Sequence, residues 1–263
     1  MMRIRTLIEK EFIDIARNRS ALVPVVLVTA MSLVLPFGVA IAVPAMTGRG
    51  LGNDADLVKV SSAVARNELS NDASVQLFLF QQFLMLFLLT PITGAMALAS
   101  HAIVGEKQAR TLEPLLATPI TTFELLAAKV VGALAPTLAI SLIGLVLYIG
   151  GILLFAEPGV PAAMASMRTL ILIVLVTPAA ALVSLQMAIL ISSRVNDART
   201  AQQFGVLIII PLTGVLVAQF TGSFWLSATA LGLASLGLLV LWVLLALLSV
   251  AVFERESILT RWR

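Results

Sequence analysis

The sequence predicts an all-α, polytopic membrane protein with six transmembrane helices, and three observations lead to that fold class. Of the 263 residues, 60% are hydrophobic and 12% are charged, whereas an average soluble domain has about 25% charged residues. The mean hydropathy is +1.06. Apolar runs without Asp, Glu, Lys or Arg recur along the chain, and about 20 such residues suffice for one helix to cross the hydrocarbon core.

Six runs of this kind define the predicted membrane spans. They are residues 21–43, 83–104, 130–155, 169–191, 204–220 and 226–253. The fifth run is at the lower limit of the length that a membrane helix needs. No connection between the runs is long enough for a second domain, so we expect residues 1–263 to form a single transmembrane domain.

Residues 1–20 precede the first span and predict an amphipathic helix. Its apolar positions at helical spacing are Ile4, Leu7, Ile8, Phe12 and Ile15. A helix of this kind can lie in the membrane interface with its apolar side in the acyl boundary. The alternative is a helix that continues the first span into the cytoplasm. Because the first span is longer than the core of a signal peptide, we interpret it as a retained anchor.

Residues 44–75 form the largest predicted outer loop. Leu57, Val60 and Val64 follow a helical spacing within it, and either Asn53 or Asp54 can cap the helix. The sequence therefore allows a short amphipathic outer helix, although an irregular loop fits almost as well.

The distribution of positive charge predicts the topology. Thirteen of the 17 Lys and Arg residues lie on one side of the predicted spans, and short loops rich in Lys and Arg stay in the cytoplasm. Both termini and the loop 105–129 are therefore predicted to be cytoplasmic, in a multi-pass protein of the cytoplasmic (inner) membrane. The basic charge fits anionic lipid, and no soluble basic domain is present that would bind nucleic acid. The chain has no cysteine, which excludes disulfides and thiolate metal sites.

The loop 105–129 is predicted to contain a short helix at the cytoplasmic surface. Thr111 can cap a helix that begins at Leu112, and Glu113 in the first turn suits the helix dipole. Pro119 disfavours a helical conformation at the residue before it, so the helix should end there.

The leucines of this short helix share one face. Leu112, Leu115 and Leu116 have the i, i+3, i+4 spacing, and so short a helix is not stable alone. Its leucines can pack in lipid, under their own bundle, or in a groove of a cytoplasmic partner. Thr121 and Glu124 then have the spacing of a capping box, which predicts the start of the next helix.

The stretch "VGEKQARTLEPLLATPITTFELLAAKV" resembles the signature loop of ABC-2 type transporter permeases. In that family the loop lies between the second and third of six spans, as it does here. The resemblance implies that residues 111–118 are a coupling helix, which sits in a groove of a separate ATP-binding subunit. It also implies that the N-terminal helix is the family's elbow helix and that "SSRVNDARTAQQ" is a second cytoplasmic loop near the ATPase.

The resemblance implies a set of residues that couple the chain to the ATPase. These are Glu106, Arg110, Thr111, Leu112, Glu113, Leu115, Leu116, Pro119, Asp197 and Arg199. The implied partners are an ATP-binding cassette ATPase subunit and a second permease chain, in a homodimer or a heterodimer. The chain has no G-x-x-x-x-G-K-[ST] pattern, so we expect the partner to bind ATP and Mg. We expect no catalytic, cofactor-binding or metal-binding residue in this chain.

Gln186 and Gln219 are the polar side chains deepest in the fourth and fifth spans. Buried polar groups of this kind often join membrane helices to one another, and the alternative is that they line a substrate path. The pairs Thr90–Pro91 and Thr177–Pro178, together with Pro211, are candidate hinges, because proline removes a helical hydrogen bond.

We expect the chain to be the permease subunit of an ATP-driven ABC exporter. The alternative within transport is a sodium or small-drug efflux permease of the same family. A membrane-embedded enzyme and a non-transporting anchor or regulatory subunit are alternatives from other classes. The single histidine, His101, and the lack of acids within the spans weigh against an enzyme and against a proton-driven carrier.

Overall fold

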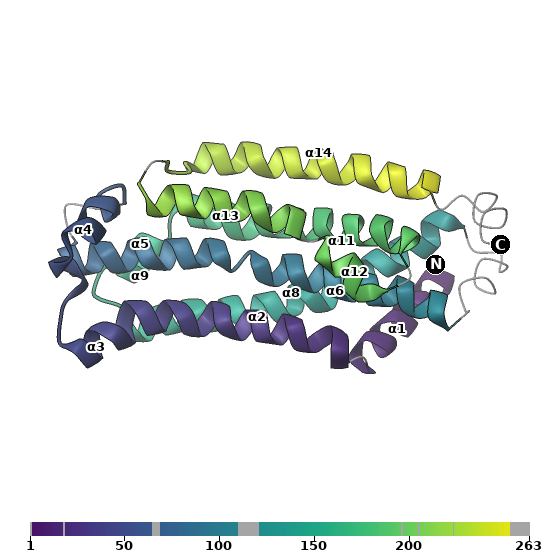
Figure 1. The fold of residues 1–263 in the computed structure, drawn as a ribbon, viewed down its shortest axis with the longest axis horizontal. Helices are drawn as coiled ribbons and strands as arrows, with labels where there is room; N and C mark the ends of the chain where they lie inside the picture. Colours follow the sequence, from purple (N-terminus) through teal and green to yellow (C-terminus); the bar gives the residue numbers. More distant parts are fainter. Residues whose placement is uncertain are drawn as a thin grey trace.

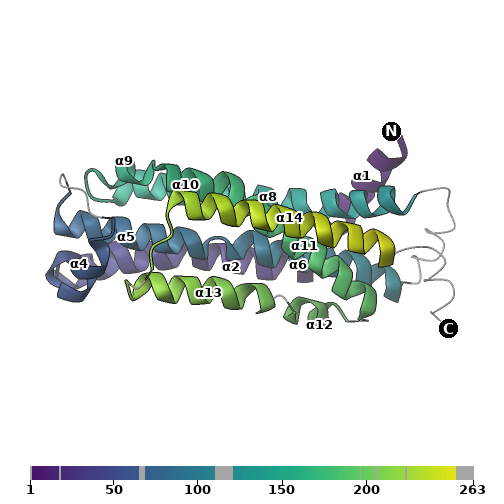
Figure 2. The same cartoon turned by 90° about the horizontal axis from the view of Figure 1, so that it is seen from above.

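The computed structural model describes residues 2–17, 19–64, 69–109, 121–195, 197–204, 206–222 and 224–252. Across these ranges the structure is 87% helix, joined by turns and short irregular stretches, and has no strands. Figure 1 shows the long helices side by side along one axis, and Figure 2 shows the same bundle from above. The all-α fold class is confirmed.

The helices are named here in chain order. They are α1 (Met2–Arg17), α2 (Arg19–Phe37), the π-helix η1 (Gly38–Ala42), α3 (Val43–Thr47), the 3-10 helix η2 (Leu51–Asn53), α4 (Ala55–Ser61), α5 (Asn71–Leu86), α6 (Leu89–Gln108), α8 (Thr122–Phe155), α9 (Val160–Met164), α10 (Met167–Ile171), the π-helix η3 (Leu172–Val176), α11 (Thr177–Arg194), α12 (Ala198–Gln203), α13 (Val206–Phe220) and α14 (Ala228–Val252).

Five helical segments of the described chain are long and apolar enough to cross a membrane. They are Ala21–Thr47, Asn71–Gln108, Glu124–Phe155, Met167–Arg194 and Ala228–Ala251. The predicted span 204–220 corresponds to α13, which has 15 residues and a described apolar part of Ile209–Phe220. Fifteen residues extend about 22 Å, against a hydrocarbon core of about 30 Å. The sixth span therefore stays a prediction.

The second long helical segment begins earlier than the sequence predicted. Ser70 caps α5, which starts at Asn71, so the outer loop is shorter than residues 44–75. The sequence places the start of the apolar run at residue 83 because three glutamines precede it. These side chains are nevertheless buried inside the bundle: Gln76, Gln81 and Gln82. Gln76 bonds across helices, donating to the carbonyl of Ala40 and accepting from the backbone N–H of Glu157.

The short outer helix is confirmed as α4, and its cap is Asp54. The Asp54 carboxylate accepts hydrogen bonds from the N–H groups of Asp56 and Leu57 at 3.0 and 3.1 Å. These two N–H groups belong to the first turn, where a helix has no carbonyl partners of its own.

Glycines on α8 let α2 approach closely. A Cβ atom on Gly144 would lie 2.8 Å from Cγ2 of Thr29, and one on Gly151 would collide with the ring of Phe37. Small residues allow membrane helices to pack backbone against backbone in this way. The aromatic ring of Phe37 in turn packs on Phe80 and Tyr148.

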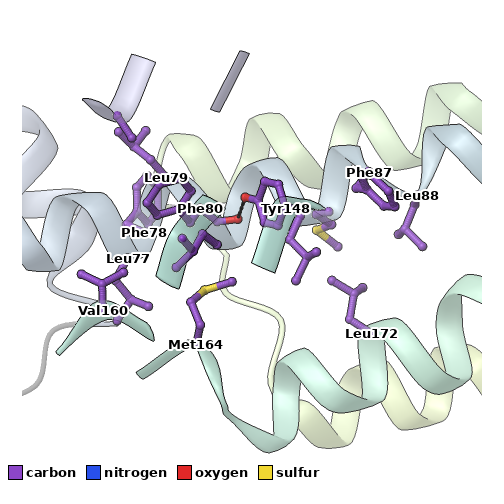
Figure 3. Packing of buried hydrophobic residues seen from close by; sticks show 14 of the residues in the cluster. Leu77, Phe78, Leu79, Phe80, Phe87, Leu88, Tyr148, Val160, Met164 and Leu172 are labelled. Carbon is purple, nitrogen blue, oxygen red and sulfur yellow. Dashed lines mark hydrogen bonds between the residues drawn. The ribbon is translucent and has the colours of Figure 1, made fainter. Parts of the chain in front are cut away.

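Tyr148 anchors the central part of the core. Its side chain is fully buried, and its hydroxyl donates to the carbonyl of Phe80 at 2.7 Å. Figure 3 shows this bond among the packed side chains of α5, α8 and the segments after α8. A buried phenol needs such a partner, so the bond fixes α8 against α5.

Both Thr–Pro pairs coincide with irregular helix. The turn at Phe87–Leu88 separates α5 from α6, and Thr90 donates to the carbonyl of Phe87 at 3.1 Å just before Pro91. The π-helix η3 ends where Thr177–Pro178 begins. A proline without an N–H explains both breaks, since it removes one bond from the helical ladder.

We predict that Gly151→Ala lowers the free energy of unfolding by about 2 kcal/mol, because the new methyl group forces the Phe37 ring out of its packed position. Gly150→Ala is the matched control, since a Cβ at Gly150 has no atom within 4 Å. This control should be neutral or slightly stabilising, because alanine favours a helix over glycine. Unfolding of the purified variants by SDS in detergent micelles measures both values, and equal losses in the two variants would contradict this packing.

Candidate functional site

The elements that the sequence predicts to be cytoplasmic gather at one end of the bundle. Figures 1 and 2 show α1, the end of α6, the start of α8, the end of α11 and α12 together there, opposite α4 and α9. We call it the α1 end. Its polar side chains form ion pairs and hydrogen bonds between helices.

Four charged side chains form an ion cluster between three helices at the α1 end. The Glu106 cluster consists of Lys10 and Glu11 of α1, Glu106 of α6 and Lys129 of α8. Glu106 accepts from Lys10 through Oε1 at 2.7 Å and pairs with Lys129 through Oε2 at 2.7 Å. Lys129 also pairs with Glu11 at 3.2 Å. Glu106 and Lys129, at the two ends of the loop 105–129, are thereby joined to each other and to α1.

The cluster is buried, so its charges depend on one another. Glu11, Glu106 and Lys129 have exposed fractions of only 4%, 8% and 3%. Lys129 donates to the carbonyl of Ala102 at 3.2 Å as well. Burial opposes the charged form of Lys10, but the hydrogen bond and charge of Glu106 outweigh it and raise the pKa of Lys10. A buried charge that loses its partner has no water to replace it.

Gly132 makes room for α1 beside this cluster. It follows Lys129 by one turn of α8, and a Cβ atom there would lie 2.6 Å from Cβ of Glu11. Only glycine at this position lets the backbone of α8 come close enough for Glu11 to reach Lys129.

Lys107 joins α6 to a further helix. Its ammonium group donates to the carbonyls of Ser192, Ser193 and Val195 at 3.0, 3.0 and 2.9 Å. These carbonyls end α11, where the last turn of a helix lacks N–H partners and carries partial negative charge. Lys107 therefore caps α11 from α6, directly beside the second predicted cytoplasmic loop.

Asp197 begins α12 in that loop. Its carboxylate accepts from the N–H groups of Arg199 and Thr200 at 3.3 and 3.2 Å, and from the Thr200 hydroxyl at 3.1 Å. The bond from the Arg199 N–H contributes most to lowering the pKa of Asp197. Asp197, Arg194 and Arg199 are all exposed, so the loop presents one negative and two positive charges to its surroundings.

The predicted coupling residues divide into two groups. Glu106, Asp197 and Arg199 lie at the α1 end, although Glu106 is buried against α1 and α8. The others lie outside the described residues: Arg110, Thr111, Leu112, Glu113, Leu115, Leu116 and Pro119. Thr121 and Glu124, which follow this gap, form the predicted capping box of α8.

Sequence reasoning missed the partners of Glu106. Glu11 carried a usable signal, because it lies four residues after Leu7 and three after Ile8, inside the apolar face of α1. A carboxylate on an apolar face implies a buried cation nearby. The identity of that cation cannot be read from the local sequence, because Lys129 lies 118 residues after Glu11.

Gln186 and Gln219, the predicted substrate-path residues, connect helices in the structure. Gln186 of α11 donates to the hydroxyl of Ser249 of α14. Gln219 of α13 accepts from Arg168 at 3.0 Å and donates to the sulfur of Met85 at 3.4 Å. Their role in a path stays a prediction.

Arg168 contacts several segments at the end of the bundle opposite the α1 end. Its sequence context did not indicate this role. Its guanidinium donates to the side chains of Gln81 and Gln219 and to the carbonyl of Leu226, and it lies 4.0 Å from the centre of the Trp225 ring. Within the described ranges, no three His, Cys, Asp or Glu side chains come together as a metal site.

We predict that Glu106→Gln and Lys129→Met each lower the free energy of unfolding by about 3 kcal/mol, because each leaves a buried charge without its partner. The double variant should lose about 1–3 kcal/mol less than the sum, since the two residues share one interaction. Unfolding of the four proteins by SDS gives this double-mutant cycle. Additive losses would show that the pair is not coupled.

Comparison with protein-family models identifies one family that matches the chain. The model of the ABC-2 family transporter proteins matches residues 5–249, which include every described residue of the Glu106 cluster. Comparison with curated proteins finds no significant match. The matched region covers most of the chain and all five long apolar segments begin within it. The chain therefore belongs to the ABC-2 transporter family and is a multi-pass membrane component of a transporter.

Proposed function

We propose that the chain is the permease subunit of an ATP-driven exporter. Proteins of the ABC-2 family normally work with an ATPase subunit, and the chain has no phosphate-binding G-x-x-x-x-G-K-[ST] pattern of its own. The observation that carries the proposal is the Glu106 cluster, because it ties both ends of the loop 105–129 to a third helix.

The cluster supports a simple route for mechanical coupling. A force on the loop acts on Glu106 at the end of α6 and on Lys129 near the start of α8. Because both side chains pair with α1, the three helices move together or the buried ion pairs break, at a cost of about 3–5 kcal/mol. Lys107 extends the same connection to α11 and α12.

The proposal assigns the remaining parts as follows. The partner ATPase holds ATP and Mg, and the leucines of residues 112–116 fill its groove. A second permease chain, identical or related, completes the path across the cytoplasmic membrane. Exposed apolar side chains cover much of α2, α8 and α14, and these surfaces suit both lipid and a second chain. The α1 end faces the cytoplasm, where Lys and Arg are concentrated.

We predict that a Leu112→Asp/Leu115→Asp variant loses its ATPase partner, because two carboxylates cannot enter an apolar groove. The tagged chain is purified from native membranes in mild detergent, and its partners are identified by mass spectrometry. Ala117→Asp is the matched control, since helical spacing places residue 117 away from the leucine face.

A Walker-motif ATPase should be recovered with the wild type and the control but not with the double variant at equal expression. If no ATPase is recovered, or if the double variant retains it, the anchor or enzyme alternatives are favoured instead.

We predict that the Lys107→Met variant binds the ATPase but transmits its motion poorly. Its stimulation of ATP hydrolysis should fall about tenfold, because a coupling free energy of this size lies within the usual range. Lys59→Met, an exposed position on α4, is the control with the same change of charge. Reconstituted ATPase assays measure the effect, and unchanged stimulation by Lys107→Met would remove α11 from the proposed route.

A further inference from the structure

A cavity of about 200 Å³ lies between α5, α8 and the η3–α11 segment. Every residue that lines it is uncharged, and most are leucine or another apolar type. Its polar side chains are Ser141 of α8 and Thr177 at the start of α11. No residue of the Glu106 cluster and neither of the predicted substrate-path glutamines lines it.

Two irregular stretches of helix meet at this cavity. Phe87, in the turn between α5 and α6, lines one wall, and Leu172 and Ile173 of η3 line another. Figure 3 shows Phe87 and Leu172 on the two helices that face each other there. Interruptions of an α-helix by π-helix occur frequently at functional sites.

Proline also removes a hydrogen-bond donor at the wall. Thr177 donates its N–H to the carbonyl of Leu172, five residues earlier. In the same register the next donor would serve the carbonyl of Ile173, but that donor position is Pro178, which has no N–H. Both Ile173 and Pro178 line the cavity.

Ser141 is the second polar feature of the wall. Its side chain has an exposed fraction of 5%, and its hydroxyl has no hydrogen-bond partner among the described residues. Other buried hydroxyls bond to their own helix, as Thr137 does to the carbonyl of Ala133 at 2.8 Å. Thr90, Ser100 and Ser192 share the unpartnered state of Ser141 among the described residues, but they do not line the cavity. A buried hydroxyl without a partner is unfavourable, and a bound polar group would satisfy it.

Part of the cavity wall belongs to the outer surface of α8, because Leu142 lines the cavity and has an exposed fraction of 61%. An adjoining hollow of about 160 Å³ shares Leu84 and Ile173 with it and continues toward α9.

We propose that this cavity binds a small, uncharged, hydrophobic molecule that carries one hydroxyl group, of the size of a substituted benzene ring. The size fits, because an apolar cavity of about 150 Å³ takes up benzene. The uncharged walls exclude an ion. The hydroxyl of the ligand donates to the carbonyl of Ile173, whose in-register donor position is Pro178, or bonds to Ser141. That such a molecule is transported cargo rests on the proposed function, whereas its binding does not.

Photolabelling of the purified chain in lipid nanodiscs, without any ATPase, tests the binding. The probe is a trifluoromethyl-diazirinyl benzyl alcohol, and the competitors are benzyl alcohol, toluene and benzoate. We expect adducts on residues 84–87, 138–145 or 172–178. Benzyl alcohol should compete about fivefold better than toluene, which lacks the hydroxyl, and benzoate should not compete.

Two variants of Ser141 distinguish the effect of its hydroxyl group from the effect of the cavity volume. Ser141→Ala should remove the advantage of benzyl alcohol over toluene and retain labelling, whereas Ser141→Leu should fill the cavity and abolish labelling. Ser184→Ala is the matched control, because this buried hydroxyl bonds to the carbonyl of Ala180 and does not line the cavity. It should behave as the wild type.

Three results would overturn the proposal. They are adducts spread along the exposed face of α8 that persist in Ser141→Leu, equal competition by toluene and benzyl alcohol in the wild type, and displacement of the probe by a saturated acyl-chain lipid alone. The last result would assign the cavity to lipid. Because no ATPase is present, a failure here leaves the proposed coupling untouched, and a failure of the pull-down leaves the binding result untouched.

Discussion

The rest of the α1 end depends on one constraint, which is that Glu106 must keep its charge where water is scarce. Two lysines from two other helices satisfy it, at 2.7 Å each, and Glu11 balances the second positive charge. The four side chains are neutral as a set, so the group tolerates burial that none of its members would tolerate alone. This neutrality requires α1, α6 and α8 to meet at one point, and Gly132 permits that approach.

Helix α6 holds two separate connections with adjacent residues. Glu106 and Lys107 project about 100° apart around the helix axis, so one faces α1 and α8 while the other reaches the end of α11. At its other end α6 begins after the turn at Phe87–Leu88. It is thus a helix with ionic contacts at one end and a break in the hydrogen-bond ladder at the other.

Local features were predictable from sequence, and distant contacts were not. The Thr121–Glu124 box depends on residues within three positions, so its spacing alone predicts it, whereas for α4 the local pattern left both Asn53 and Asp54 as possible caps. The start of α5 was placed too late because hydropathy treats glutamine as polar wherever it lies. Gln76 satisfies its amide with Ala40 and Glu157, which are 36 and 81 residues away, and no local pattern specifies such partners.

Hydrogen bonding separates the buried polar groups into two kinds, which composition does not distinguish. Gln186 and Gln219 have partners on neighbouring helices, and a satisfied amide inside a membrane bundle stabilises packing. Ser141 has no partner among the described residues, nor does the amide of the fully buried Gln82. Gln82 follows Phe78 by one turn of α5, and the Phe78 ring packs on Trp225. A buried polar group without a hydrogen bond raises the free energy of the folded protein. At a cavity wall, a ligand that bonds to such a group removes this cost, and the binding free energy of the ligand becomes more favourable.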